Sequence, residues 1–185
     1  PWIRRLRVQR PDIRIDLREV DGTDPSPLLE GQADLIVAPL LDVPAGIVKK
    51  RVATLHPCLV LPGGHRLAKR KRVGLKDLAG ETFVGYTPGT LLHELQMQEL
   101  LRHGLRPGNV LTTESTDTIL GYVESGLGFS LIPWLDPAGP RIAGVASRPY
   151  AARRHVHAVY AVWRASSADN PLVKAAVACA PEDAG

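Results

Sequence analysis

The residues best placed to bind a small molecule form a short, hydroxyl-rich segment from Tyr86 to Thr90. This segment joins a predicted strand to the strongest predicted helix of the chain. The free amide groups in the first turn of a helix point outward and carry partial positive charge, so they attract anions. Gly89 allows a ligand to approach the backbone closely, because it has no side chain. The segment therefore predicts a site for a small anion, and a carboxylate is the expected chemistry.

The side chains of this segment have separate predicted roles. Thr87 and Thr90 can donate hydroxyl hydrogen bonds to the anion, and Tyr86 can form an aromatic wall beside it. The simpler interpretation is that Thr87 or Thr90 only caps its own helix. The two interpretations are compatible, because a capping hydroxyl accepts through its oxygen and can still donate its proton.

Two further segments could complete this site. Ser115 and Thr116 begin a second predicted helix, with Thr116 as its cap, and could make a second anion contact. Pro39 and Pro133 each follow an apolar strand, and we expect them to close the pocket with apolar surface. Each of these residues is equally consistent with an ordinary turn, and Phe129 is expected in the core.

A catalytic site or a metal site would be the alternative to a binding site. The chain has no GxSxG, P-loop, GxGxxG or HExxH motif, and glycine-rich 62–65 lacks the Lys-Ser/Thr of a P-loop. His155 with His157, and His56 with Cys58, would each share one strand face, but zinc needs about four converging ligands. We therefore expect no catalytic residue, no cofactor and no metal site, and a protein that is not an enzyme.

Composition indicates an ordinary globular chain of 185 residues, 44% hydrophobic and 23% charged. The net charge of +4 is too small to predict nucleic-acid binding by itself, and the basic run at 69–72 is interpreted as a solvated loop, although it could touch phosphate. No apolar run approaches the roughly 20 residues needed to span a bilayer. Cys58 and Cys179 lie in apolar surroundings, so we expect two buried thiols in a cytoplasmic protein.

The elements that must position the site alternate between strand and helix patterns. A first helix carries Trp2, Ile3 and Leu6 on one face and ends before Pro11. Such alternation predicts an α/β fold with mostly parallel sheets. The predicted strands cover 13–17, 35–38, 48–55, 58–61, 82–86, 110–113, 129–132 and 156–163, and the later helices cover 75–78, 90–103, 116–126 and 171–179. The helix 90–103 is expected to bury a face made of Leu92, Leu95, Leu100 and Leu101.

Five phrases along the chain resemble, in order and in spacing, those of LysR-type transcription regulators. They are LRVQRPDIRIDLRE at 6–19, LLEGQADLIV at 28–37, LVLPGGHRLA at 59–68, VGLKDLAGETFV at 73–84 and YVESGLGFSLIP at 122–133. Each phrase alone is weakly specific, but the five together are strongly specific and cover nearly the whole chain. The chain is therefore similar to the effector-binding domain of that family, although 134–140 departs from the helix start usual there.

The resemblance implies a two-lobed fold like that of type 2 periplasmic binding proteins, with two crossing strands and an effector in the interlobe cleft. Residues 1–55 plus 161–185 would form lobe I, and residues 56–160 would form lobe II. Family members also carry an N-terminal winged helix-turn-helix, a linker helix and a first strand of lobe I, which we expect to lie outside this chain. Thr23, after the second strand of lobe I, would supply an effector-binding hydroxyl across the cleft.

The implied function is an effector-sensing module that controls transcription allosterically, with DNA contacted through the absent N-terminal domain. The resemblance also implies a homodimer or homotetramer, in which the helix holding Trp2 lies against helix 90–103 of a partner. The alternative for Trp2 is packing on its own lobe. The main alternative function is the solute-binding protein of a transporter, which shares this fold, and an enzyme on the same fold is a third possibility.

Overall fold

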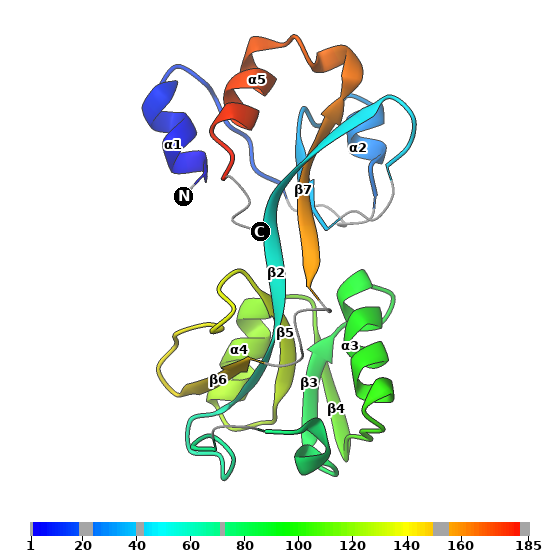
Figure 1. The fold of residues 1–185 in the computed structure, drawn as a ribbon, viewed down its shortest axis with the longest axis vertical. Helices are drawn as coiled ribbons and strands as arrows, with labels where there is room; N and C mark the ends of the chain where they lie inside the picture. The colour runs from blue at the N-terminus through cyan, green and yellow to red at the C-terminus, as the bar shows by residue number, and fades with distance from the viewer. Residues whose placement is uncertain (1, 19–23, 40–42, 71–72, 150–155, 182–185) are drawn as a thin grey trace. The chain divides into compact units, whose positions relative to one another are not determined.

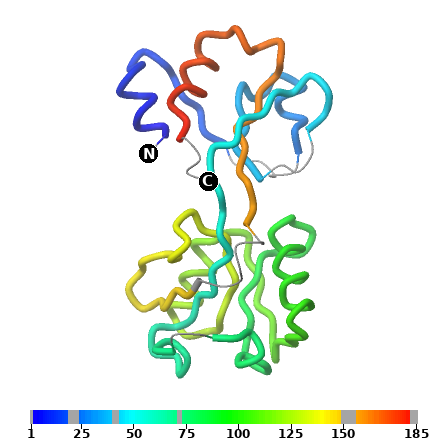
Figure 2. Tube along the Cα trace, in the orientation of Figure 1, coloured from blue at the N-terminus to red at the C-terminus, as the bar shows by residue number. Residues whose placement is uncertain are grey.

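A computed structural model describes residues 2–18, 24–39, 43–70, 73–149 and 156–181, and it shows a mixed α/β chain (Figures 1 and 2). The chain divides into two compact units. Unit 1 comprises Pro1–Thr54 and His157–Gly185, and unit 2 comprises Leu55–Val156. Strand β2 (Ile47–Pro62) begins in unit 1 and ends in unit 2.

Unit 1 is built on a sheet in which β7 (His157–Arg164) lies between β1 (Ile36–Ala38) and β2. β1 and β7 are antiparallel, with Ile36 opposite Val162. The short helix α2 (Ser26–Leu29) packs on this sheet, and its Leu28 is fully buried in the same apolar cluster. A single 3-10 turn, η3 (Ala165–Ser167), follows β7.

Two helices at the ends of the chain pack together in unit 1. α1 (Trp2–Gln9) lies beside α5 (Pro171–Ala178), and the indole Nε1 of Trp2 donates a 2.6 Å hydrogen bond to the carbonyl of Ala176. Leu6 is the buried residue of α1. Trp2 therefore packs on its own unit, as the alternative interpretation of this residue expected.

The predicted strand at 13–17 is wrong, because the structure gives these residues no regular element. Alternation of apolar and polar residues orients side chains, but a strand also needs a neighbouring strand to take its backbone hydrogen bonds. No other described segment forms a ladder with 13–17.

Unit 2 holds a parallel pair of strands flanked by helices. In chain order its elements are η1 (Leu75–Leu78), β3 (Thr82–Tyr86), α3 (Leu91–Arg102), β4 (Asn109–Thr113), α4 (Thr116–Glu124), β5 (Ser130–Trp134) and β6 (Val145–Pro149). β3 and β4 pair in parallel from Thr82↔Asn109 to Tyr86↔Thr113. The second half of β2 pairs with β5 on one side and with β6 on the other.

The strands of unit 2 separate two apolar cores. On β3 the side chain of Phe83 belongs to one core and that of Tyr86 to the other, as the two-residue period of a strand requires. α3 adds Leu100 to the first core and α4 adds Ile119 to the second, so the two helices cover opposite faces of β3 (Figure 1). Phe129 is fully buried in the first core as predicted, with its ring centroid 5.3 Å from that of Phe83 in an edge-to-face arrangement.

The expectation of mostly parallel sheets is wrong for the ladders that the structure describes. β1 with β7, β2 with β5 and β2 with β6 are antiparallel, whereas β3 with β4 is parallel. An unbroken apolar run indicates burial on both faces of a strand, but it does not specify the direction of the neighbouring strand.

The two strands predicted at 48–55 and 58–61 are one continuous strand, β2. Pro57 does not interrupt it, because Pro57 lies opposite Pro133 of β5. Neither proline has an N–H group, so this pair suits the positions of an antiparallel ladder at which facing residues exchange no hydrogen bonds. β5 consequently continues through Pro133 to Trp134, beyond its predicted end.

Three further details differ from the predictions for unit 2. β6 was not predicted at all. The cap of α4 is Ser115, whose hydroxyl accepts from the amide of Thr118, and not Thr116. On α3, Leu101 is 78% exposed, while Gln96 takes a buried position beside Leu100. A polar side chain can replace an apolar one in a core when its hydrogen bonds are satisfied there.

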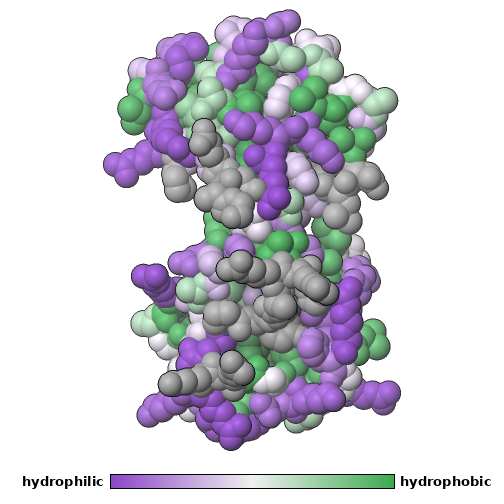
Figure 3. All heavy atoms as spheres, in the orientation of Figure 1, coloured by the Kyte–Doolittle hydropathy of each residue, from purple (hydrophilic) through white to green (hydrophobic). Residues whose placement is uncertain are grey.

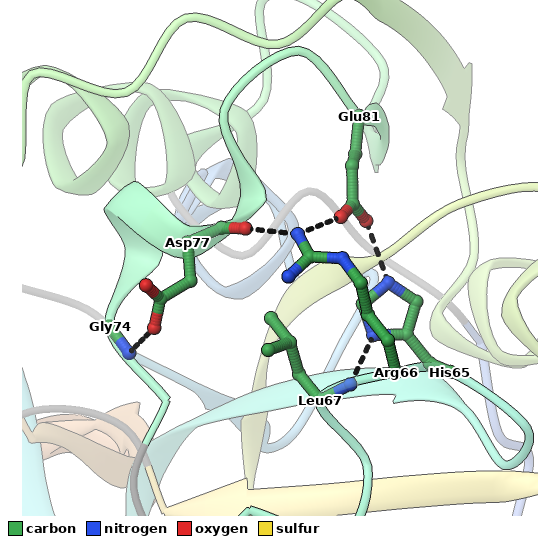
Figure 4. A network of polar contacts seen from close by, with 6 residues as sticks. All are labelled: His65, Arg66, Leu67, Gly74, Asp77 and Glu81. Carbon is green, nitrogen blue, oxygen red and sulfur yellow. Dashed lines mark hydrogen bonds and ion pairs between the residues drawn. The ribbon is translucent and has the colours of Figure 1, made fainter.

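A cluster of charged groups holds the amino end of β3 (Figure 4). Glu81 accepts from His65 Nε2 at 2.8 Å and from the guanidinium of Arg66 at 2.7 Å, and Arg66 also donates to the carbonyl of Asp77. The amide of Leu67 donates to His65 Nδ1, which places the ring proton on Nε2. We call His65, Arg66, Asp77 and Glu81 the amino-end cluster; it ties the loop after β2 to η1 and β3.

Candidate functional site

Two helices of unit 2 begin where two neighbouring parallel strands end. β3 ends at Tyr86 and β4 at Thr113, and the amide of Thr87 donates to the carbonyl of Thr113 at 3.0 Å, which extends their pairing by one residue. α3 begins after the cap Thr90, and α4 begins after the cap Ser115. The free first-turn amides of both helices therefore follow directly from adjacent strand ends, the usual location of ligands in α/β sheets.

The turn from Thr87 to Thr90 is held by its own hydrogen bonds. The hydroxyl of Thr90 accepts from the amide of His93 at 3.2 Å and donates to the carbonyl of Thr87 at 3.0 Å. Both its proton and its accepting lone pair are thus used inside the turn. Thr90 therefore shapes the turn, whereas the hydroxyl of Thr87 has no hydrogen-bond partner in the part of the chain that the structure describes.

Gly89 leaves open space at this turn. Its φ of +90° is in the region that favours glycine, and a Cβ atom built there would meet nothing within 4 Å. The preceding proline and this positive φ suit a type II turn, in which the third residue needs a positive φ. Backbone groups of the turn can thus be approached closely, as the sequence predicted for Gly89.

The start of α4 is joined to the end of β3 by two hydroxyl groups. The phenol oxygen of Tyr86 lies 2.6 Å from Oγ1 of Thr116, while Ser115 caps the helix. Tyr86 is only 2% exposed and packs among core residues of the α4 side, so most of its ring is not available as a wall. Burial raises the pKa of the Tyr86 phenol, and the hydrogen bond to Thr116 partly opposes this rise.

The other predicted site residues lie in different places. Pro39 follows β1 in unit 1, and Pro133 lies within β5 of unit 2. Thr23 lies outside the described residues. Within unit 2 the structure brings together six of the predicted residues at the ends of β3 and β4: Tyr86, Thr87, Gly89, Thr90, Ser115 and Thr116.

Sequence reasoning missed two residues of α3 that hold the end of β3. Nδ1 of His93 lies 2.8 Å from the carbonyl of Tyr86, and Oε1 of Gln96 accepts from the amide of Tyr86 at 2.8 Å. A signal was present, because Gln96 falls midway between Leu92 and Leu100, on the stripe that an amphipathic helix buries. A polar residue on such a stripe indicates a specific buried hydrogen bond.

The two helix starts combine the partial positive charge of their free amides with acidic side chains. Glu94 lies in the first turn of α3 and Asp117 in that of α4, so each helix carries an acidic group near its positive end. Among the described residues, no group of three or more His, Cys, Asp or Glu side chains could hold a metal ion. None of the described helices is long and apolar enough to cross a membrane. The arrangement can therefore bind a ligand through backbone amides and hydroxyl groups.

Comparison with known proteins assigns the chain to a family. The profile of the LysR substrate binding domain matches residues 1–185. The chain belongs to this family. The family is one of transcription regulators and not of enzymes. This agrees with the resemblance carried by the five phrases.

Relatives match this chain over only part of their own length. An uncharacterized HTH-type transcriptional regulator of Escherichia coli (strain K12), YnfL, is 31% identical over 133 residues, which are 69% of this chain and 44% of that protein. The transcriptional activator protein LysR of the same organism is 27% identical over 130 residues, 68% of this chain and 42% of that protein. The matched region thus spans less than half of these relatives.

Solved structures share the fold. The BenM effector binding domain with its effector benzoate has a TM-score of 0.77 and 22% identity, covering 96% of this chain and 82% of that one. The effector binding domain of QuiR in complex with shikimate has a TM-score of 0.74 and 17% identity, covering 96% of this chain and 86% of that one. At these identities the similarity establishes the fold.

Proposed function

We propose that this domain binds a small carboxylate effector at the ends of β3 and β4, and that the effector controls transcription by the full-length regulator. The observation that supports this most directly is the pair of capped helix starts after adjacent parallel strands. Their free amides are arranged for an anion before any ligand arrives, which lowers the cost of binding.

Individual residues have defined roles in this proposal. The hydroxyl of Thr87 and the amides of the first turn of α3 hold one end of the anion, and Gly89 gives access to them. Ser115 and Thr116 present the amides of α4, and Tyr86 fixes Thr116 in place. Pro133, Pro39 and Thr23 remain proposed as further contacts of the same ligand.

The ligands of the structural neighbours support this ligand class. Benzoate and shikimate each carry one carboxylate, and the domains that bind them share the fold of this chain. Glu94 and Asp117 disfavour a multiply charged anion at the same place. A small monocarboxylate, whose remaining atoms are uncharged, therefore fits best.

The proposed mechanism is allosteric and involves no covalent step. An effector can shift a conformational equilibrium only by its different affinity for the two states, commonly about 1–3 kcal/mol. DNA would be contacted through an N-terminal domain outside this chain, in the cytoplasm where the chromosome lies.

Calorimetric titration of the domain tests the effector class. Benzoate and shikimate represent carboxylates, benzamide a neutral analogue and benzylammonium a cation. We expect binding of a carboxylate, and a loss of affinity of about 10- to 100-fold in Thr87→Val and in Thr23→Val, because a hydrogen bond to a charged group is removed. Thr82→Val, at the amino end of the same β3, is the matched control.

Two outcomes of this titration would contradict the proposal. Binding of benzylammonium or benzamide without any carboxylate would show that the charge assignment is wrong. Carboxylate binding that neither Thr87→Val nor Thr23→Val weakens would place the anion elsewhere in the domain.

We also propose that the regulator is a homodimer or homotetramer in which α1 of one protomer packs on α3 of its partner. Apolar side chains are scattered among hydrophilic ones over the face shown in Figure 3. On α1, Ile3 and Val8 are exposed, and on α3 Leu101 is the most exposed large apolar residue. Exposed apolar groups on two helices suit an interface. Leu101→Lys should therefore yield monomers in light scattering. Leu172→Lys, a change of an exposed leucine on α5, is the control and should leave the oligomer intact.

A further inference from the structure

The strands β3 and β5 separate after a short contact, and this separation creates a structural requirement. They touch as parallel neighbours at Phe83 and Phe129, where the amide of Val84 donates to the carbonyl of Phe129 at 2.8 Å. Beyond this point no ladder joins β3 to β5 among the described residues, and the ladder of β5 is with β2. The amide of Tyr86 on β3 and the carbonyl of Leu131 on β5 are then buried groups without backbone partners, which is costly unless another group bonds them.

The side-chain amide of Gln96 satisfies both groups. Its Oε1 accepts from the Tyr86 amide at 2.8 Å, and its Nε2 donates to the Leu131 carbonyl at 2.7 Å and lies 3.5 Å from the hydroxyl of Ser130. The orientation of the amide is unambiguous, because an N–H faces one end and a carbonyl faces the other. Gln96 therefore acts as a peptide group inserted between the two strands.

The side-chain amide of Gln96 is buried in a closely packed space between β3 and β5. Gln96 is only 4% exposed, and Ser130 is fully buried. A Cβ atom at position 85 would lie 3.0 Å from Oε1 of Gln96 and 2.8 Å from the ring of Phe83, so Gly85 makes the space that the amide occupies. One helical turn earlier, His93 bonds the carbonyl of Tyr86, so α3 holds both backbone polar groups of this residue.

We propose that Gln96 is the positioning residue of the effector site: its amide, with His93, fixes the end of β3 and hence the turn that carries Thr87 and Gly89. The inference rests on the proposed effector site for its binding consequence, but not for its structural one. Loss of the bridge should release the turn from Tyr86 to Thr90 while the ladder through Val84 and Phe129 remains.

Amide hydrogen exchange measured by NMR tests the structural part with Gln96→Leu. We expect exchange at the Tyr86 amide, which loses its acceptor, and at the Thr87 amide, whose bond to Thr113 is then less well supported, to accelerate at least about tenfold more than exchange at Val84 and Phe129, which reports the global loss of stability. Equal acceleration at all four amides would indicate general destabilisation and would overturn the proposal.

Gln96→Glu provides a rescue that a space-filling role would not show. A protonated carboxyl has one accepting oxygen and one O–H donor, so it can bond Tyr86 and Leu131 as the amide does, whereas the carboxylate can only accept. In Gln96→Glu, exchange at the Tyr86 and Thr87 amides should be slow near about pH 4–5 and fast near about pH 8, after correction for the intrinsic pH dependence of exchange. Gln96→Leu, which cannot ionise, should show no such reversal.

Other ionisable groups near this position require the same pH series in the unmodified chain. His93 and Glu99 lie one turn away on α3, Tyr86 faces Gln96 from β3, and the segment 130–134 of β5 carries no ionisable side chain. If the same pH-dependent change in exchange occurs in the unmodified chain and in Gln96→Leu, it comes from these groups. That result would contradict the rescue.

Titration with benzoate and shikimate connects the bridge to binding. If the unmodified domain binds either probe, Gln96→Leu should bind it about tenfold more weakly, because the ligand must then order the turn itself. Unchanged affinity would overturn the positioning role. If the unmodified domain binds neither probe nor any other carboxylate, the proposed effector class fails, and the exchange measurements still decide the role of Gln96.

Discussion

The two ends of strand β3 are held by opposite kinds of chemistry. At the amino end the charged amino-end cluster is partly open to solvent, with the side chains of His65 and Glu81 15% and 27% exposed. At the carboxyl end the hydrogen bonds are made by neutral groups, and Gln96 is nearly inaccessible to solvent. Charges in contact with water are screened and replaceable, whereas a buried amide has no alternative partner. Loss of a contact should therefore cost more stability at the carboxyl end of β3, where the proposed site lies, than at the amino end.

The largest expected effect is that of Gln96→Leu on stability. The change leaves the buried amide of Tyr86 and the carbonyl of Leu131 unsatisfied, at about 1–3 kcal/mol for each. We expect the free energy of unfolding of the domain, measured in urea, to fall by about 2–6 kcal/mol. A loss below about 1 kcal/mol would show that water or other groups replace the bridge, and would remove the contrast between the two ends.

The caps of the two helices at the carboxyl end should have intermediate effects. Thr90→Ala removes the acceptor of the His93 amide and the donor to Thr87, and Ser115→Ala removes the acceptor of the Thr118 amide. Each should lower the unfolding free energy by about 1 kcal/mol, the usual value of an N-cap. Thr90→Ser and Ser115→Thr keep the hydroxyl and are the matched controls, so equal losses in these variants would argue against capping.

A smaller effect is expected from Glu81→Gln at the amino end. Glu81 forms an ion pair with Arg66, whose side chain is largely exposed, and such a pair typically contributes below about 1 kcal/mol and is screened by salt. Raising the ionic strength should therefore reduce the difference between the unmodified domain and Glu81→Gln, while the effect of Gln96→Leu should not depend on salt. A salt-independent loss as large as that of Gln96→Leu would make the two ends equivalent.

The raised pKa of the Tyr86 phenol should make the free energy of unfolding depend on pH only in the alkaline range. Burial raises its pKa above the ordinary value, so the folded state retains the proton more tightly than the unfolded state does. The resulting stability is fully present below the ordinary tyrosine pKa of about 10 and is lost as pH rises through the higher folded pKa. Carbon-13 NMR of labelled tyrosine should show a resonance that titrates above the ordinary tyrosine pKa and is absent in Tyr86→Phe. An ordinary pKa for this resonance would mean that the ring is more open to solvent.

Local sequence patterns determined much of unit 2. The turn Leu75–Leu78 and the strand Thr82–Tyr86 have their predicted bounds, and the helix predicted at 90–103 is α3 with Thr90 and His103 as its caps. Caps, glycine stops and hydrophobic periods act within a few residues, so they can be recognised without knowing the fold. The ordered phrases also predicted the family to which the chain belongs.

Tertiary structure alone decided which groups meet. The direction of the strands, the continuity of β2 through Pro57 and the irregular segment at 13–17 depend on neighbours that are distant in the sequence. The same holds for Gln96, whose three polar partners lie 10, 34 and 35 residues away. The helical stripe could have indicated that this side chain is buried, although the predicted face did not include it. A buried amide acquires its role from the unpaired groups it meets, and these exist only because β3 and β5 diverge in the folded structure.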